Sequence, residues 1–138
     1  MTGLAEPIRA FLATGPIAHV VTLDADGAPQ VSIAWVGVED DEIVIGTLHE
    51  QAKLRNLRRD RRIALSFQAP GRTAYDLENY LVLRGTARVT DGGAAVLLHD
   101  LAQIYIGPGT PFPPMPDPPP GFVIRVTVEK VSGNGPWR

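Results

Sequence analysis

Cysteine is absent from this sequence, which excludes disulfide bonds, thiolate nucleophiles, cysteine-bound iron–sulfur clusters and zinc ribbons. Long apolar runs are absent too, since none approaches the roughly 20 residues that cross a bilayer. Residues 1–7 contain neither the basic region nor the apolar core of a secretion signal. We therefore expect a cytoplasmic protein with no membrane partner.

The sequence also lacks the motifs of several large enzyme classes. It has no glycine-rich dinucleotide fingerprint and no P-loop, so neither a Rossmann site nor a Walker-type ATPase is expected. The histidines, His19, His49 and His99, match no zinc spacing, and we predict no metal site. Ser32 and Ser66 lack the glycine elbow of a hydrolase serine. No side chain is therefore assigned a catalytic role.

Net charge is small, at −2, but it is unevenly distributed. Residues 53–62 hold six basic side chains and one acidic side chain, so this segment carries +5 and the remainder −7. One short basic segment on an otherwise acidic chain indicates a local site for a small anion. A nucleic-acid surface would need a wider positive face, so no nucleic-acid partner is expected.

Apolar residues recur with the periods of strands and helices along a single predicted domain, residues 1–138. The pattern predicts six strands, at 17–23, 28–36, 42–47, 63–68, 80–90 and 122–131. It also predicts helices at 4–12, 51–59 and 94–106, and turns at 24–27, 37–41 and 70–71. Strands and helices do not alternate regularly, which favours an antiparallel β-barrel with short helical plugs over a doubly wound sheet.

Proline is concentrated in one segment, because residues 107–120 contain eight prolines together with two glycines. Proline removes a backbone donor and fixes φ, so this segment cannot be a regular helix or strand. We predict a semi-rigid, polyproline-like coil.

The basic segment begins where a predicted strand leads into a predicted helix. A helix N-terminus offers an anion free backbone N–H groups and the positive end of the helix dipole. Lys53 and Arg55 add charge there, and Thr47 and Asn56 add neutral donors. This arrangement predicts a phosphate site. The alternative is a solvated basic face, above all for the arginines at 58–62.

Three aromatic residues are placed to line a planar ligand: Trp35, Tyr80 and Trp137. Trp35 and Tyr80 fall in or beside predicted strands, so ordinary barrel packing is an equal alternative for both. Trp137 lies near the C-terminus, where a frayed tail is the alternative. For each of these three residues, ligand contact and its alternative both stay open.

Most of the chain is covered by four segments: VVTLDADGAPQVSIAWV, IGTLHEQAKLRNLRRDRRIALSF, YLVLRGTARV and VIRVTVEKVSGNGPW. In this order they resemble the pyridoxamine 5′-phosphate oxidase-like proteins, and most closely the actinobacterial branch that uses the deazaflavin coenzyme F420. The part AKLRNLRRDRR is fairly specific, whereas the first segment alone would be weak. The resemblance implies a mainly β fold, the FMN-binding type of split barrel, and a homodimer with two cofactor sites at its interface.

The resemblance also implies a set of cofactor-binding residues. Those at the phosphate and in the loop that approaches it are Gly46, Thr47, Gln51, Lys53, Arg55 and Asn56. Those near the ring system are Ser32, Ile33, Trp35 and Tyr80, and Trp137 lies in a tail that would cover the partner's site. The sequence departs from the family's pattern at Arg61, where a proline is usual, and in its long proline-rich segment.

The implied function is that of a reductase that uses reduced F420 to transfer a hydride to a small organic acceptor. A deazaflavin has carbon in place of the reactive ring nitrogen of flavin, which favours hydride chemistry over reaction with oxygen. Two alternatives stay open, namely an FMN-dependent oxidoreductase on the same fold and a non-catalytic carrier of F420 or flavin. Oxidation of pyridoxamine phosphate itself is not expected, because the sequence offers no second phosphate site.

Overall fold

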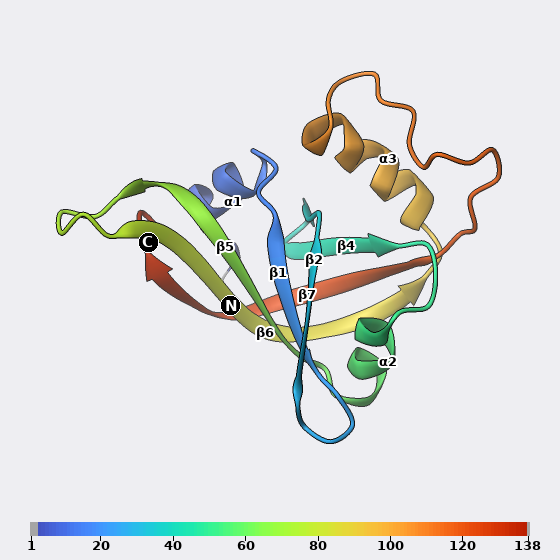
Figure 1. Cartoon of the computed structure of the whole chain (residues 1–138), viewed down its shortest axis with the longest axis horizontal. Coiled ribbons are helices and arrows are strands. Elements are labelled where there is room, and N and C mark those ends of the chain that lie inside the picture. Colours follow the sequence, from blue (N-terminus) through green and yellow to red (C-terminus); the bar gives the residue numbers. More distant parts are fainter. Residues whose placement is uncertain (1–2, 138) are drawn as a thin grey trace.

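The structure, a computed structural model, describes residues 3–137. Within this range, Figure 1 shows a strongly bent sheet with short helices packed around it, and none of these helices is long and apolar enough to cross a membrane. The helices are α1 (Glu6–Leu12), α2 (Ala52–Arg59) and α3 (Ala94–Tyr105). The strands are β1 (Ala18–Leu23), β2 (Pro29–Ala34), β3 (Gly37–Glu39), β4 (Glu42–Thr47), β5 (Arg62–Arg72), β6 (Glu78–Asp91) and β7 (Phe122–Asn134).

In the described range the strands form one seven-stranded antiparallel sheet, in the order β2-β1-β5-β6-β7-β4-β3. The sheet curls around its core without closing, so β2 and β3 remain as its two edges. This is the arrangement of a split barrel, and the predicted mainly β, antiparallel split-barrel fold is confirmed.

The predicted number of six strands is wrong by one. The sequence pattern predicts only a turn over 37–41, whereas the first three of these residues form β3 and pair with β4. The bend is confined to Asp40 and Asp41, and Asp40 has a positive φ of 55°. An edge strand of three residues is too short to show a period in the sequence.

The turn between β5 and β6 lies further along the chain than the predicted 70–71. β5 continues to Arg72, and the N–H of Thr73 donates to the carbonyl of Leu77 at 2.8 Å to close the turn. The β5–β6 register shifts between Gln68 and Arg72. This irregularity accommodates Pro70, which has no N–H to offer the neighbouring strand.

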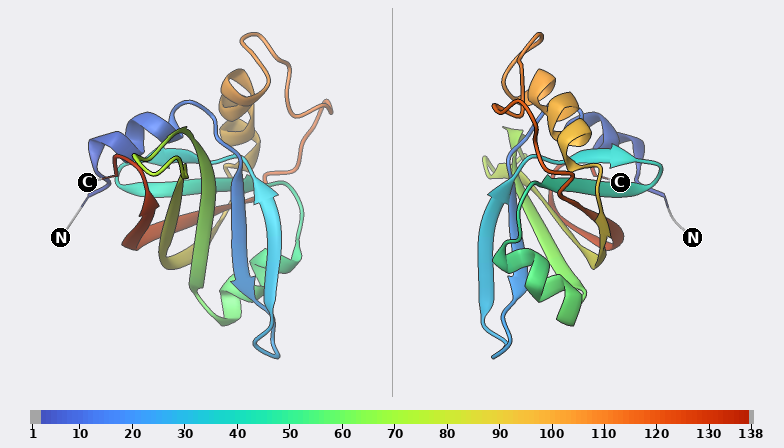
Figure 2. Two further views of the ribbon diagram at one scale, coloured as in Figure 1. Left: turned by 60° about the vertical axis from the view of Figure 1, so that its left-hand side comes forward. Right: turned by 90° about the vertical axis from the view of Figure 1, so that its right-hand side faces the viewer.

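The core fills the inside of the barrel, and helices cover it. Leu54 and Leu57 of α2 are fully buried there, and Ile8 and Leu12 of α1 join the same cluster. The predicted helix 51–59 is therefore confirmed as an amphipathic plug. Its packing fixes the position of the loop that connects β4 to α2 (Figure 2).

Outside this core, α3 packs over β4 with a small cluster of its own, in which Leu97 and Leu101 contact Val44. Gly46 allows the close approach, since a Cβ atom at this position would lie 3.1 Å from the side chain of Leu98. Residues 107–120 form no helix or strand, as predicted. Together, α3 and this proline-rich loop project from one end of the molecule (Figure 2).

Candidate functional site

The junction between β4 and α2 has the features expected of an anion site. Thr47 is the last residue of β4, Gln51 is the N-cap of α2, and the helix begins at Ala52. The Gln51 side chain makes no capping hydrogen bond, and the first turn of the helix holds no acidic residue. The positive end of the helix dipole is therefore open to an anion.

Lys53 lies in this first turn and is only 7% exposed. Burial lowers the pKa of its ammonium group. No carboxylate of residues 3–137 forms an ion pair with it. A partly desolvated cation without a partner is less stable than one with a counter-ion, so this position favours a bound anion that supplies the missing charge.

Two buried hydroxyl groups lack a hydrogen-bond partner within the described chain, Ser32 Oγ on β2 and Thr47 Oγ1 on β4. Buried polar side chains almost always have such a partner. Thr47 directly precedes the loop into α2, and Ser32 shares a face of β2 with Gln30, which contacts Thr22 through its side chain. Neither hydroxyl therefore has the protein partner that buried polar groups usually have, and Thr47 is the one next to the helix start.

Asn56 is the other buried polar residue of α2, but its amide is fully used within the chain. Its Nδ2 donates to Thr22 Oγ1 at 3.0 Å and to Asp24 Oδ1 at 2.9 Å. Its Oδ1 accepts from the guanidinium of Arg59 at 3.1 Å. Asn56 therefore ties α2 to the β1–β2 hairpin and acts here as a positioning residue for the first turn.

Most arginines beyond the first turn are bound to partners in the chain. The partners are Glu50 for Arg58 (2.6 Å), the Leu23 carbonyl for Arg59 (2.6 Å), the Ala87 carbonyl for Arg61 (3.3 Å) and Asp60 for Arg62 (2.7 Å). Arg55 is exposed and makes no hydrogen bond within residues 3–137. The basic segment therefore divides in two, and only Lys53 and Arg55 are left for an anion.

The residues predicted to lie beneath the ring system follow the edge strand β2. Val31 and Ile33 are 60% and 64% exposed, which is unusual for apolar strand residues. Trp35, just past the end of β2, is half-buried because it stacks on Tyr105 of α3, with 5.3 Å between ring centroids. An exposed apolar stripe of this kind suits a flat ligand or a partner surface.

The remaining residues of the predicted cofactor-binding set lie away from the exposed face of β2. Gly46 faces α3, and Tyr80 is exposed on β6. Trp137 is buried in the core beside Phe11, and its indole N–H donates to the Tyr80 carbonyl at 2.9 Å. The alternative of a frayed tail is therefore wrong for Trp137, while its role at a partner's site stays a prediction.

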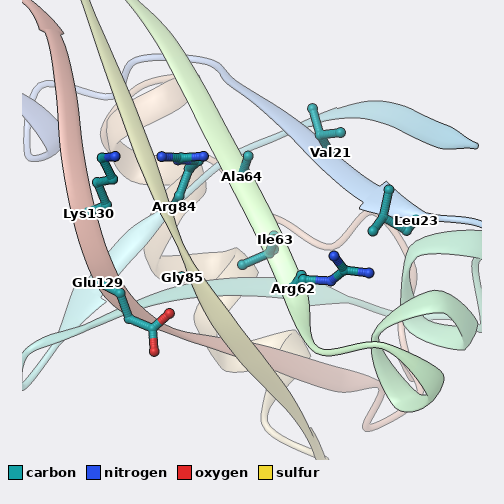
Figure 3. Close-up of a pocket in the computed structure, with 9 residues that line it drawn as sticks. All are labelled: Val21, Leu23, Arg62, Ile63, Ala64, Arg84, Gly85, Glu129 and Lys130. Carbon is teal, nitrogen blue, oxygen red and sulfur yellow. The ribbon is translucent and has the colours of Figure 1, made fainter. Parts of the chain in front are cut away.

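A hollow of about 530 Å³ lies on the outer face of β1, β5, β6 and β7 (Figure 3). Val21 and Ala64 form part of its apolar side, and Arg84 and Lys130 lie on its basic side. Arg84 and Lys130 are directly opposite each other on β6 and β7, and neither forms an ion pair within the described range. Like charges in this position repel each other, and the hollow also holds one acidic side chain, Glu129, so its lining is of mixed charge.

Sequence reasoning missed this hollow. Arg84 lies between buried neighbours on a predicted strand, which indicates that it points outward, whereas Lys130 follows another exposed residue, Glu129. Their closeness depends on the β6–β7 register, which shifts at Gly85. A Cβ atom at Gly85 would lie 1.9 Å from the carbonyl oxygen of Thr127, so only glycine allows this register.

The comparisons with known proteins agree with the fold. The sequence profile of the family described as pyridoxamine 5′-phosphate oxidase matches residues 4–135. Among proteins of curated function, none matches this chain.

Several solved structures share the fold at low sequence identity. One is described as an F420 reductase, with 22% identity, a TM-score of 0.71, and coverage of 90% of this chain and 94% of its own. A conserved hypothetical protein from Mycobacterium tuberculosis has 24% identity, a TM-score of 0.73, and coverage of 96% and 87%. A heme binding protein from Mycobacterium smegmatis has 22% identity, a TM-score of 0.66, and coverage of 98% and 55%. Because the family profile spans almost the whole sequence and the fold agrees, this chain belongs to the pyridoxamine 5′-phosphate oxidase family.

Proposed function

We propose that this protein is a reductase that uses reduced F420 to pass a hydride to a small organic acceptor. The observation that supports this most strongly is Lys53, a mostly buried residue in the first turn of α2 whose ammonium group has no ion-pair partner in the described chain. A phosphate at this helix end would neutralise the charge and bind to the free end of the helix. A flavin-like cofactor with a phosphate fits the family to which the chain belongs.

The residues at the junction suit such a group. Lys53 and Arg55 would supply positive charge, and Thr47 Oγ1 would supply a donor that has no other partner among residues 3–137. The flat ring system would lie along the exposed face of β2 against Ile33, whereas Ser32 points to the opposite face of the strand.

When bound, reduced F420 supplies a hydride, which together with one proton from solvent completes the two-electron reduction of the acceptor. The chain itself binds and orients. Lys53 would hold the charged end of the cofactor, and the exposed face of β2 would hold the flat end. Ile33 would cover the face of the ring that lies on β2 and exclude water from it, which would strengthen polar interactions in the site. No side chain of this chain is assigned as proton donor or acceptor.

Two other functions would use the same site. FMN also combines a phosphate with a flat ring, and the family's oxidase chemistry favours an FMN-dependent oxidoreductase as the second candidate. The lack of an assignable proton donor favours a non-catalytic carrier of F420 or flavin as the third. We prefer F420 because of the AKLRNLRRDRR segment and the fold shared with an F420 reductase.

We also propose that two copies form a homodimer, in which each copy completes the other's cofactor site. Val31 pairs with Val21 across β2 and β1, so the exposed stripe of β2 continues into the hollow of Figure 3. A single barrel would leave this apolar surface and one face of the ring in water. Val31→Glu should therefore give a monomer by light scattering and weaken cofactor binding, and a wild-type monomer would contradict the dimer.

A fluorescence titration of the cofactor-free protein with F420 and, separately, with FMN tests the assignment of the cofactor. We expect saturable binding of F420 that is tighter than binding of FMN and is lost in Lys53→Ala. Arg72→Ala is the matched control, because Arg72 is an exposed cation at the end of β5 and its loss should leave both affinities unchanged.

Each other result of the titration has a definite meaning. Preference for FMN together with rapid oxygen-dependent turnover would assign the protein to the flavin-dependent oxidoreductases. F420 binding without reduction of a broad panel of acceptors would indicate a carrier. Binding of neither cofactor would overturn the proposal.

A further inference from the structure

Two uncharged stretches of the chain meet beside the proposed cofactor strand. Residues 27–38 and 101–116 contain no Asp, Glu, Lys or Arg. They come together at Trp35, which stacks on Tyr105 with an interplanar angle of 15° and lies 5.2 Å from the ring of Phe112. This uncharged surface contrasts with the basic first turn of α2, which suits an anion.

The proline-rich loop is fastened to α3 at both of its ends. Near its start, the N–H of Gly109 donates to Gln103 Oε1 at 2.7 Å, and Gln103 Nε2 donates to the Thr110 carbonyl at 2.8 Å. At its far end, the N–H of Ala94 donates to the Pro120 carbonyl at 3.0 Å. Because its prolines already restrict the backbone, the loop presents a preformed surface and loses little entropy when a ligand binds.

Phe112 is the one aromatic residue of this loop, and two contacts hold it. Its ring lies beside Trp35, and its carbonyl is hydrogen-bonded to Nδ1 of His99 on α3 at 3.0 Å. Both rings remain half-buried, so part of each is accessible. Trp35 and Phe112 therefore form a small aromatic wall.

Tyr105 holds this wall in place from behind. Its hydroxyl donates to the Pro16 carbonyl at 2.6 Å and accepts from the N–H of Val36 at 3.0 Å. These bonds fix the Tyr105 ring, and the stacked ring of Trp35 is fixed with it. Tyr105 is thus a positioning residue, while Trp35 and Phe112 offer the accessible faces.

The wall lies directly beyond the strand that would hold the cofactor ring. Ile33 is exposed on β2, and Trp35 follows it two residues later, so the two share a face of the strand as it continues past its end. A molecule that stacks on Trp35 therefore lies next to a ring bound along Ile33.

We propose that Trp35 and Phe112 bind the electron acceptor, and that the acceptor is an uncharged, planar, apolar molecule. This inference rests on the proposed function and adds the acceptor's chemical class. An aromatic wall stabilises a flat ring by stacking and apolar contact. An anionic acceptor would lose hydration here and would find no cation in residues 27–38 or 101–116. The proline-rich loop thereby determines the acceptor specificity of this chain.

Tryptophan fluorescence tests the proposal on the full chain without any turnover. The sequence contains two tryptophans, and Trp137 is buried in the core, so a change in the signal of Trp35 reports on the surface around it. Menadione, a neutral planar quinone, should quench the fluorescence saturably, and Trp35→Phe should remove this part of the signal. A naphthoquinone sulfonate, which adds a negative charge to the same ring, should bind about tenfold more weakly.

Variants of the loop then separate stacking from loop order. Phe112→Leu keeps an apolar anchor but removes the ring, and it should weaken menadione binding about tenfold while leaving F420 affinity unchanged. In F420-dependent turnover it should raise the KM for menadione more than it lowers kcat. Gln103→Ala, which frees the start of the loop, should have a smaller effect in the same direction. Tyr75→Ala removes an aromatic that is 87% exposed at the β5–β6 turn and is the matched control.

The outcomes distinguish this inference from the function on which it rests. Unchanged menadione affinity in a folded Phe112→Leu protein would overturn the acceptor wall, and so would equal binding of the sulfonate. F420 binding with acceptor kinetics insensitive to Phe112 would overturn the wall but leave the proposed function intact. Menadione binding that depends on Phe112, without any F420 binding, would retain the wall and overturn the proposed function.

Discussion

The first and last turns of α2 both carry positive charge, but they differ in the burial and in the ion pairing of the charged side chain. In the last turn, Arg58 is exposed and paired with Glu50 at 2.6 Å. In the first turn, Lys53 is buried and has no ion pair within residues 3–137. An exposed pair contributes little to stability, whereas a buried unpaired cation lowers stability unless a ligand supplies its counter-ion. One basic segment therefore contains a structural part and a binding part.

Burial alone does not separate these parts, as Asn56 shows. Asn56 is as buried as Lys53 and lies one helical turn away, but its amide has three partners in the chain. The informative property is an unused hydrogen-bonding or charged group, and on α2 only the first turn has one on a mostly buried side chain. Substitutions along this one helix can therefore test the comparison directly.

The largest effect is expected from Lys53→Met, which removes the charge but keeps the length of the side chain. Cofactor affinity should fall about 10- to 100-fold, because a hydrogen bond to a charged group contributes roughly 1.5–3 kcal/mol. The free energy of unfolding of the cofactor-free protein should stay the same or rise, since an apolar group replaces an unpaired buried charge. Ligand titration and chemical denaturation measure the two effects. A large loss of stability with unchanged affinity would reverse the assignment of the first turn.

Asn56→Ala should show the opposite pattern. It leaves Thr22 and Asp24 without the amide that binds them, and the free energy of unfolding should fall by about 1–3 kcal/mol. Urea denaturation measures this loss, with Arg55→Ala as the exposed control on the same helix. Cofactor affinity should change less than in Lys53→Met, and the reverse order would mean that Asn56 contacts the ligand directly.

A smaller, continuous effect should appear with pH. Burial lowers the pKa of Lys53 in the folded state below its ordinary value of 10.5, so the unfolded chain binds more protons between the two values. The stability of the cofactor-free protein should therefore rise with pH across this window, while cofactor affinity should fall as the ammonium group is lost. Stability and affinity measured against pH in the wild type and in Lys53→Met isolate the contribution of this group. Identical pH profiles for the two proteins would contradict it.

The smallest effect is expected from Arg58→Gln. Its ion pair with Glu50 is exposed, so the free energy of unfolding should change by no more than about 0.5 kcal/mol. Cofactor affinity should stay within about twofold of the wild-type value, because the last turn is not part of the proposed site. Thermal denaturation and the same ligand titration suffice. A tenfold loss of affinity would extend the anion site along the whole helix.

The regular parts of the fold follow from short-range patterns in the sequence. The alternation in β1 and β2, the amphipathic residues of α2 and the prolines of 107–120 predict those segments because each pattern reflects the geometry of one element. The position of the basic first turn of α2, after β4, is predicted for the same reason. The phosphate site at that start is an inference from general helix physics, and it stays a prediction that the titrations above test.

The parts that sequence reasoning missed depend on which residues meet across elements. The three residues of β3 form a strand only because they pair with β4. Trp137 is buried only because it packs beside Phe11 and its indole N–H donates to a carbonyl of β6. Lys130 comes to face Arg84 through a register that Gly85 permits.

The sequence by itself determined the elements of this protein and the segment that holds its positive charge, because periodicity and composition act over a few neighbouring residues. Only the tertiary structure decided which of those charges are already neutralised. Arg58 pairs with Glu50 eight residues away, Arg59 donates to the Leu23 carbonyl at the end of β1, and Lys53 has no such partner within residues 3–137. Hydrogen bonds and ion pairs reach only a few ångströms, so the partners of a side chain are set by the fold that brings distant residues together.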